Sequence, residues 1–248
     1  MFESELSSGY LFHFTKSLDV LISIIKNGFY PRCAVEDVHF AMPNLSKEQS
    51  KMGIPMVCFC DMPLNLSTIH RSQYGKYGIA LSKEWGIEKG IAPVHYVIEN
   101  SSENKSFIKL ERFVHSIICD YKEVCKKANI PFYEEKINED LINIMFDYIG
   151  NLKFYSENND SKPYYDEREW RYLVPFYDGN DQKVSNRLLY DDLNDEARKK
   201  KFNDEMAKRY KITFEISDIS QIILPQHDDI EKICEQINID PNIIKVIK

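Results

Sequence analysis

Glycine and proline are scarce in this chain of 248 residues, with 9 and 10 copies respectively. This scarcity excludes collagen-like and low-complexity proteins. Hydrophobic residues make up 43% of the sequence and aromatic residues 12%, which is typical of an ordered globular protein. Because no internal repeat and no linker rich in Ser, Gly or Pro divides the chain, we expect a single domain over residues 1–248.

Long apolar runs and an excess of positive charge are also lacking. The longest apolar run, around Val20 to Ile25, is interrupted by Ser23 and is too short to span a bilayer. The first residues have no basic start followed by an apolar stretch. Since 32 basic residues face 39 acidic ones, no overall field attracts nucleic acid or anionic lipid. We therefore expect a cytoplasmic protein without a membrane partner.

Common metal and nucleotide motifs are missing as well. The six cysteines form no Cys-x-x-Cys pair, and no His-x-x-x-His accompanies Cys58 and Cys60, so we expect reduced thiols and no metal. The sequence also lacks a Walker loop, a Gly-x-Gly-x-x-Gly turn after a strand and a Gly-x-Ser-x-Gly elbow. Kinase, Rossmann and hydrolase functions lose support.

Hydrophobic periodicity predicts a mixed α+β fold with flanking helices. Strands are predicted at residues 10–14, 55–61, 77–81, 93–98, 169–174, 210–216, 221–224 and 243–247. Helices are predicted from Ser17 to Gly28, at 196–209 and at 228–236, with a short helix or ordered loop at 64–73. A change to helical period predicts a helical insertion at about 105–160.

Polar side chains cluster at the end of the first predicted strand. His13 and Thr15 point to the same side of an extended segment and can therefore meet one ligand together. The alternative is a structural histidine, with Thr15 satisfying backbone groups at the helix entry. A second candidate segment contains Tyr74 and Tyr77 beside two glycines. These rings either stack on a flat ligand or cover the edge of the core.

A third segment, residues 166–172, carries charges into an apolar strand. Glu167 and Glu169 share one face of the strand, and Arg171 is close to both in sequence. Either carboxylate is salt-bridged to an arginine, or it stabilises positive charge on a sugar centre during cleavage of a glycosidic bond.

Two family resemblances follow from these segments. Residues 11–15, followed by a helix that ends at Gly28, resemble the opening of DNA-modifying ADP-ribosyltransferase toxins of the DarT kind. Residues 57–64, 74–79, 93–97 and 165–172, in this order, resemble the AbiGi-type abortive phage infection family.

The resemblance implies an ADP-ribosyltransferase-like split β-sheet that holds NAD as a substrate in a His, Tyr, Glu layout. His13 would bind the ribose with support from Thr15, and Tyr77 or Tyr74 would stack on nicotinamide. Glu169 would stabilise the oxocarbenium, and Glu167 would aid the acceptor.

The implied function is an NAD-dependent ADP-ribosyltransferase-like toxin or effector of phage defence that modifies a nucleic acid or a protein. Two alternatives share the fold, an NAD glycohydrolase and a non-catalytic antitoxin or immunity module. The expected protein partner is a cognate antitoxin for the toxin and a cognate toxin for the binding module. Neutralisation of Glu169 by Arg168 or Arg171 would favour the binding module.

Basic residues supply the remaining candidates. Arg32 and Arg71 either contact the NAD pyrophosphate or are solvated arginines. Residues 196–211 contain seven basic and three acidic residues, starting from the run Arg198 to Lys201, with Phe202 and Tyr210 between them. This segment is either a solvated helix face or a patch that guides RNA or DNA through phosphate contacts and base stacking.

Overall fold

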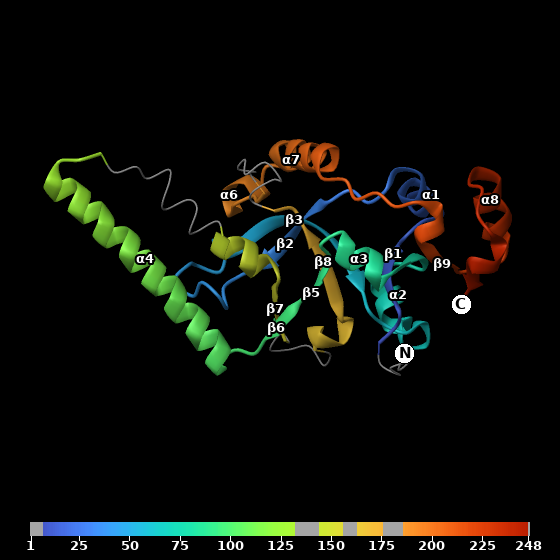
Figure 1. Ribbon diagram of the computed structural model, residues 1–248, viewed down its shortest axis with the longest axis horizontal. Coiled ribbons are helices and arrows are strands. Elements are labelled where there is room, and N and C mark those ends of the chain that lie inside the picture. The colour runs from blue at the N-terminus through green and yellow to red at the C-terminus, as the bar shows by residue number, and fades with distance from the viewer. Residues whose placement is uncertain (1–6, 132–143, 156–162, 176–185, 248) are drawn as a thin grey trace.

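A twisted, mixed β-sheet forms the centre of the computed structural model, which describes residues 7–131, 144–155, 163–175 and 186–247 (Figure 1). Within these residues, an eight-stranded sheet has the order β10-β9-β4-β1-β3-β8-β5, and β2 pairs with β3. Its strands are β1 Tyr10–Thr15, β2 Arg32–Asp37, β3 Lys51–Cys60, β4 Tyr77–Ser82, β5 Ala92–Pro93, β8 Glu169–Leu173, β9 Ile219–Leu224 and β10 Ile244–Val246. A separate parallel pair joins β6 His95–Val97 to β7 Leu152–Phe154.

The sheet changes partners at the junction between β1 and β3. Strand β1 pairs along its whole length with β4, but its register with β3 contains the single pair Phe12 and Cys60. Most of β3 pairs instead with β2, and β8 pairs with the last five residues of β3. At the junction, His13 Nδ1 lies 2.8 Å from the carbonyl oxygen of Cys58. A side chain therefore bridges the two strands where the ladder ends.

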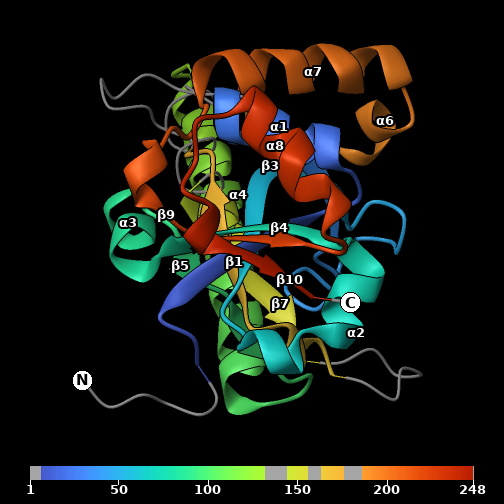
Figure 2. The same cartoon turned by 90° about the vertical axis from the view of Figure 1, so that its right-hand side faces the viewer.

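Four helices cover one face of the sheet: α1 Leu18–Asn27, α3 Lys83–Glu88, α7 Glu196–Arg209 and α8 Asp228–Gln236. Figure 2 shows α1, α7 and α8 together on this side. Helix α1 begins where the Ser17 hydroxyl accepts a hydrogen bond from the Val20 amide, and it ends at Gly28 with φ 83°. A Cβ atom at Gly28 would lie 2.4 Å from the Ile212 oxygen, so glycine also permits this close approach.

The opposite face has two separate covers. Helix α2 Thr68–Tyr74 lies near the apolar cluster of Phe12, Phe14 and Ile223. Over the other half, helical residues 144–150 and the first turns of α4 Ser102–Ala128 pack on Met52 and Ile54. Short helical segments complete the description, namely η1 Leu64–Leu66, η2 Tyr164–Glu167, α6 Tyr190–Leu193, η3 Ile216–Asp218 and η4 Pro241–Ile243. In the described ranges, no helix has both the length and the apolarity needed to cross a membrane.

The mixed α+β class is confirmed, whereas the specific ADP-ribosyltransferase-like arrangement stays a prediction. The strand predicted at 210–216 is wrong, because this segment forms only the bridge between Ile212 and Phe29 and then η3. The predicted insertion contains α4 and helical residues 144–150, but it also contains β7, whose short polar-centred sequence carries little strand signal. Its residues 132–143 and 156–160 lie outside the described residues.

Candidate functional site

A buried ion pair opens β8. In the extended strand Glu169 and Arg171 point to the same face, opposite Cys60 and Cys58 of β3. The Arg171 guanidinium donates from Nε to Glu169 Oε1 at 2.7 Å and from Nη2 to Oε2 at 3.2 Å. Arg171 is only 1% exposed. This two-pronged contact is the geometry in which arginine binds a carboxylate most strongly.

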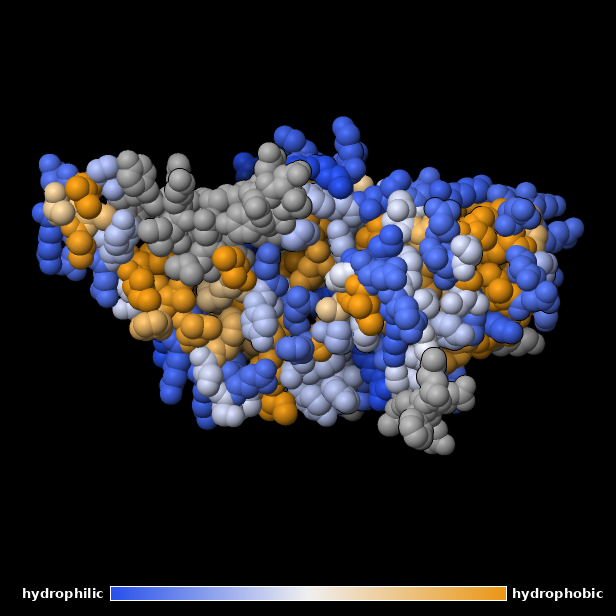
Figure 3. All heavy atoms as spheres, in the orientation of Figure 1, coloured by the Kyte–Doolittle hydropathy of each residue, from blue (hydrophilic) through white to orange (hydrophobic). Residues whose placement is uncertain are grey.

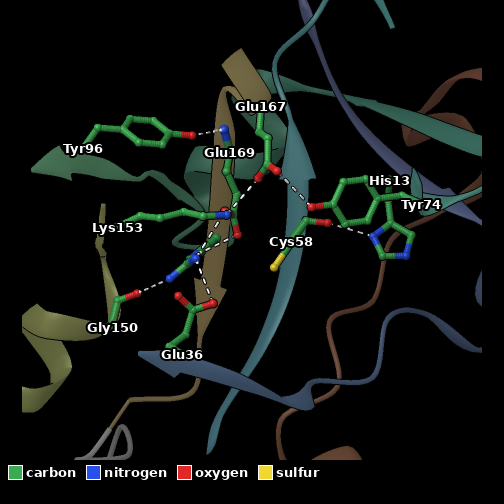
Figure 4. Close-up of polar contacts among 10 residues, drawn as sticks. His13, Glu36, Cys58, Tyr74, Tyr96, Gly150, Lys153, Glu167 and Glu169 are labelled. Atoms are coloured by element: carbon green, nitrogen blue, oxygen red, sulfur yellow. Dashed lines mark hydrogen bonds and ion pairs between the residues drawn. The ribbon is translucent and has the colours of Figure 1, made fainter. Parts of the chain in front are cut away.

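The remaining Arg171 donors reach two further elements. Nη1 donates to the Gly150 carbonyl oxygen at 2.8 Å, and Nη2 donates to Glu36 Oε1 on β2 at 3.1 Å. The guanidinium therefore links β8, β2 and the end of helical residues 144–150 (Figure 4).

Lys153 on β7 lies between the two carboxylates of the Glu-x-Glu pair. Its Nζ donates at 2.8 Å both to Glu167 Oε2 and to Glu169 Oε2. The Tyr74 hydroxyl donates to Glu167 Oε1 at 3.2 Å, while the Tyr96 hydroxyl accepts the Glu169 amide at 3.0 Å. We call Glu36, Lys153, Glu167, Glu169 and Arg171 the charged cluster (Figure 4).

Electrostatics keep Glu169, Lys153 and Arg171 ionised at neutral pH. Burial alone would raise the pKa of Glu169, but Arg171 and then Lys153 lower it to about 2. Burial opposes the charge on Lys153 and Arg171, yet the neighbouring carboxylates raise the pKa of both cations. Burial is the main reason that the pKa of Tyr96 rises to about 12. Glu169 is therefore an anion with two cationic partners.

The pair of candidate tyrosines is separated by the structure. Tyr74 on α2 contacts Glu167, as described above. Tyr77 lies opposite Thr15 in the β1 and β4 ladder, and its hydroxyl donates to Asp229 Oδ2 on α8 at 3.0 Å. Of these two tyrosines, Tyr74 contacts the Glu-x-Glu pair and Tyr77 contacts Asp229 instead.

His13 lies on the other side of β3 from Glu169. Its ring packs against Phe29 and Phe59, with centroids 5.1 and 5.7 Å away, and burial lowers its pKa. Phe59 and Cys58 are neighbours in an extended strand, so their side chains point to opposite faces. Cys58 lies opposite Arg171 in the β3 and β8 ladder, on the face of the sheet that carries Glu169. The structure thus does not bring His13, Thr15 and Tyr77 together with Glu169 into the predicted layout, because strand alternation separates them.

Comparison with known proteins identifies the family. Residues 27–225 match the family model described as "Putative abortive phage resistance protein AbiGi, antitoxin". The chain belongs to the AbiGi family. It is also 29% identical over 220 residues to "Abortive phage resistance protein AbiGi" of Lactococcus lactis subsp. cremoris, covering 79% of this chain and 82% of the relative. No solved structure matches it. The predicted resemblance to AbiGi proteins is confirmed, and the resemblance to DarT-type toxins stays a prediction.

The two arginines expected to contact the NAD pyrophosphate, Arg32 and Arg71, lie in different environments in this AbiGi-family chain. Arg71 is buried in α2, and its Nη1 donates to the Ile247 carbonyl oxygen at 3.0 Å. It therefore ties α2 to the chain end. Arg32 is exposed at the first residue of β2.

Both aromatic residues of the basic segment pack against the core, Phe202 buried and Tyr210 partly buried. Phe202 is buried with Met206 against Val174, so its ring is not available to a base. Arg198 contacts Asp192 and Asp195, and Arg209 Nη1 lies 3.6 Å from Glu205. The helical period explains the correction, because Phe202 and Met206 form the inward stripe of α7. A nucleic-acid role for Arg198 to Lys201 stays a prediction.

The sequence does not predict a role for two members of the charged cluster, Lys153 and Glu36, or for Tyr96, which contacts it. Lys153 lies inside the segment predicted as a helical insertion. Glu36 lies on β2, a strand with polar and charged residues that the sequence pattern does not predict. Tyr96 lies in residues 93–97, a segment that the sequence assigns to the family but to no site. A lysine in an alternating Leu-Lys-Phe triplet is the one local signal that could have indicated β7.

All six cysteines are free thiols in the structure. Burial, followed by the charge of Glu169, raises the pKa of the Cys58 thiol well above its ordinary value. Cys58 is therefore a protonated, poorly nucleophilic part of the site. Across the described residues, no group of three or more His, Cys, Asp or Glu side chains is arranged to hold a metal.

Proposed function

We propose that this AbiGi-family chain is the non-catalytic, antitoxin-type binding component of an abortive phage resistance system and holds a cognate protein partner. The observation that carries the proposal is the double neutralisation of Glu169 by Arg171 at 2.7 Å and Lys153 at 2.8 Å. The description of the matching family as an antitoxin supports it.

A neutralised Glu169 is poorly suited to ADP-ribose transfer. Both of its oxygens accept hydrogen bonds from cations, and the residue is 8% exposed. To hold a ribose hydroxyl, the carboxylate would have to release Arg171 or Lys153. Removing one partner from a buried ion pair typically costs about 3–5 kcal/mol because the other charge stays buried and unpaired. The same contacts suit a rigid support for a binding surface.

A group of tyrosines beside Glu167 offers such a surface. Tyr165 contacts Tyr96 and Tyr155 at ring centroid distances of 5.3 and 5.7 Å, and Lys153 Nζ lies 4.8 Å from the Tyr164 ring. Tyr165 is nonetheless about half exposed, as is Tyr74. Tyrosines are enriched at protein interfaces because they combine large apolar area with a polar tip. We place the partner's docking site over Tyr74 and Tyr165.

ADP-ribosyl transfer or NAD hydrolysis is the second candidate. The proximity of Tyr74, Glu167 and Glu169 favours it, since a tyrosine and two glutamates belong to the layout that the sequence suggests. It requires the charged cluster to open and requires His13 to act from the other side of β3. Substrate binding would have to drive both of these rearrangements.

The first experiment offers the purified chain NAD labelled in its adenylate, together with total bacterial RNA, DNA and protein. We expect neither labelled macromolecule nor free nicotinamide above the background of the Glu169→Gln variant. Turnover by the natural chain that the Glu169→Gln variant loses would instead establish the enzyme.

The second experiment tests binding directly. Each reading frame that neighbours the gene is expressed alone and with this chain, and growth is followed. We expect one frame to arrest growth, the chain to restore it, and a Tyr74→Ala/Tyr165→Ala double variant to restore it less. Ile87→Glu, an exposed change on α3, serves as the matched control. If the double variant restores growth fully, Tyr74 and Tyr165 do not form the docking site.

A further inference from the structure

Helix α4 extends away from the sheet and carries an exposed apolar stripe. The helix spans 27 residues and projects from the body of the molecule (Figure 1). Its exposed large apolar side chains are Leu110, Phe113, Ile117, Tyr121 and Val124, with exposures between 38% and 63%. Figure 3 shows apolar residues gathered at this end of the molecule.

The stripe is distinct from the face that α4 buries. Its buried residues are Asn104, Glu111, Ile118 and Cys125, spaced by seven. Ile118 follows Ile117 directly, so the two rows lie about 100° apart around the helix. The stripe residues recur at spacings of three and four, which keeps them on one side. Contiguous exposed apolar surface of this kind marks an interaction site.

The stripe has a two-fold symmetric pattern about Ile117. Phe113 and Tyr121 lie four residues on either side of Ile117, and Leu110 and Val124 lie seven residues on either side. If two copies of α4 pair antiparallel, Ile117 meets Ile117 of the second copy. In the same arrangement Phe113 faces Tyr121, and Leu110 faces Val124. A surface that is complementary to itself is what an isologous dimer requires.

Charges beside the stripe favour the antiparallel direction. Lys109 and Arg112 are exposed in the first half of α4, and Asp120 and Glu123 are exposed in the second half, where Glu123 also pairs with Lys127. Antiparallel pairing about Ile117 brings Lys109 and Arg112 of each copy toward Asp120 and Glu123 of the other, whereas parallel pairing sets each of these charges beside its own counterpart. Charges that flank a helical seam set the orientation of pairing in this way.

We propose that two copies of this chain associate through α4, with their helices antiparallel and the two-fold axis at Ile117. The occupant of the stripe is thus a second copy of the chain. The inference does not depend on the proposed antitoxin function.

Mass measurement tests the association. The full chain is run over a concentration series by light scattering after size exclusion, and we expect a rise to twice the monomer mass. Phe113→Glu/Ile117→Glu should remain a monomer, with an unchanged circular dichroism spectrum. Ile87→Glu, on an equally exposed apolar residue of α3, should still dimerise. A natural chain that stays monomeric at every concentration overturns the proposal.

Cysteine cross-linking tests the register. In a Cys119→Ser background, Ile117→Cys is expected to form a disulfide-linked dimer under air with a copper catalyst. Leu110→Cys alone should not cross-link, but it should do so when mixed with Val124→Cys. Self-linking by Leu110→Cys would indicate a parallel pair and would contradict the symmetric register.

Discussion

The two sides of β3 show how one strand can separate two kinds of environment. On the side of Phe59, His13 is enclosed by aromatic rings and makes one polar contact to the Cys58 carbonyl oxygen. On the side of Cys58, Glu169 lies in a set of mutually paired charges. The side of Phe59 is stabilised by aromatic packing and by the contact of His13 with a backbone carbonyl. The side of Cys58 contains buried ions, which are tolerated because each ion is paired.

This comparison teaches that residues close in a linear pattern need not share a site. The sequence places His13 and Glu169 at strand ends, and both strands reach the same part of β3. Their side chains nonetheless meet different chemistry, because adjacent positions of β3 face opposite ways. Four measurements can break or sharpen the contrast.

The largest expected effect comes from removing the cation that links the charged cluster. Arg171→Met leaves Glu169 and Glu36 without the guanidinium and leaves the Gly150 carbonyl oxygen without this donor. We expect the free energy of unfolding to fall by about 3–5 kcal/mol. Urea unfolding followed by tryptophan fluorescence measures it. Arg32→Met, at an exposed position, is the control and should change stability by less than about 0.5 kcal/mol.

Acid should weaken the charged side next. The folded pKa of Glu169 is about 2 and its ordinary value is 4.5, so its contribution is full above pH 4.5 and is lost between pH 4.5 and 2. Linkage makes this loss about 3 kcal/mol. Chemical unfolding at pH 5, 4 and 3 measures the part of this loss that occurs above pH 3, about 2 kcal/mol. The Glu169→Gln variant should lose less stability over this range, and identical slopes would contradict the assignment.

The aromatic side should respond at higher pH and by less. Burial lowers the pKa of His13 from 6.5, so its neutral form stabilises the fold above pH 6.5 and this stabilisation is lost as the pH falls through the lowered value. His13→Phe keeps a ring among Phe29 and Phe59 but deletes the bond to Cys58. We expect a loss of about 1–2 kcal/mol at pH 7.5. The free energy of unfolding of the natural chain should decline below pH 6.5, and that of the variant should not. If the variant shows the same decline, a group other than His13 causes it.

Local sequence signals predicted the elements that carry this comparison. The apolar runs predict β1, β4 and β8, and Ser17 with Gly28 predicts the bounds of α1. Strand alternation puts Glu169 and Arg171 on one face, and their ion pair is one of the two alternatives that the sequence leaves open. These features depend on residues within a few positions of each other.

The missing parts depend on contacts between distant segments. Lys153 neutralises Glu169 because β7 is brought beside β8, and no local pattern specifies that approach. Glu36 reaches Arg171 only because β2 and β8 both pair with β3. The separation of His13 from Glu169 likewise depends on the register across β3, which is fixed by which faces become buried.

The smallest expected effect lies at the edge of the charged cluster. Tyr74→Phe deletes a hydroxyl that donates to Glu167 at 3.2 Å, but Glu167 keeps Lys153 at 2.8 Å and Tyr74 is about half exposed. We expect the free energy of unfolding to fall by about 0.5 kcal/mol, because solvent can replace a partly exposed hydrogen bond. Tyr77→Phe, which deletes the bond to Asp229, is the matched variant. A loss above about 1.5 kcal/mol for Tyr74→Phe alone would make Tyr74 part of the charged cluster's framework rather than part of its docking surface.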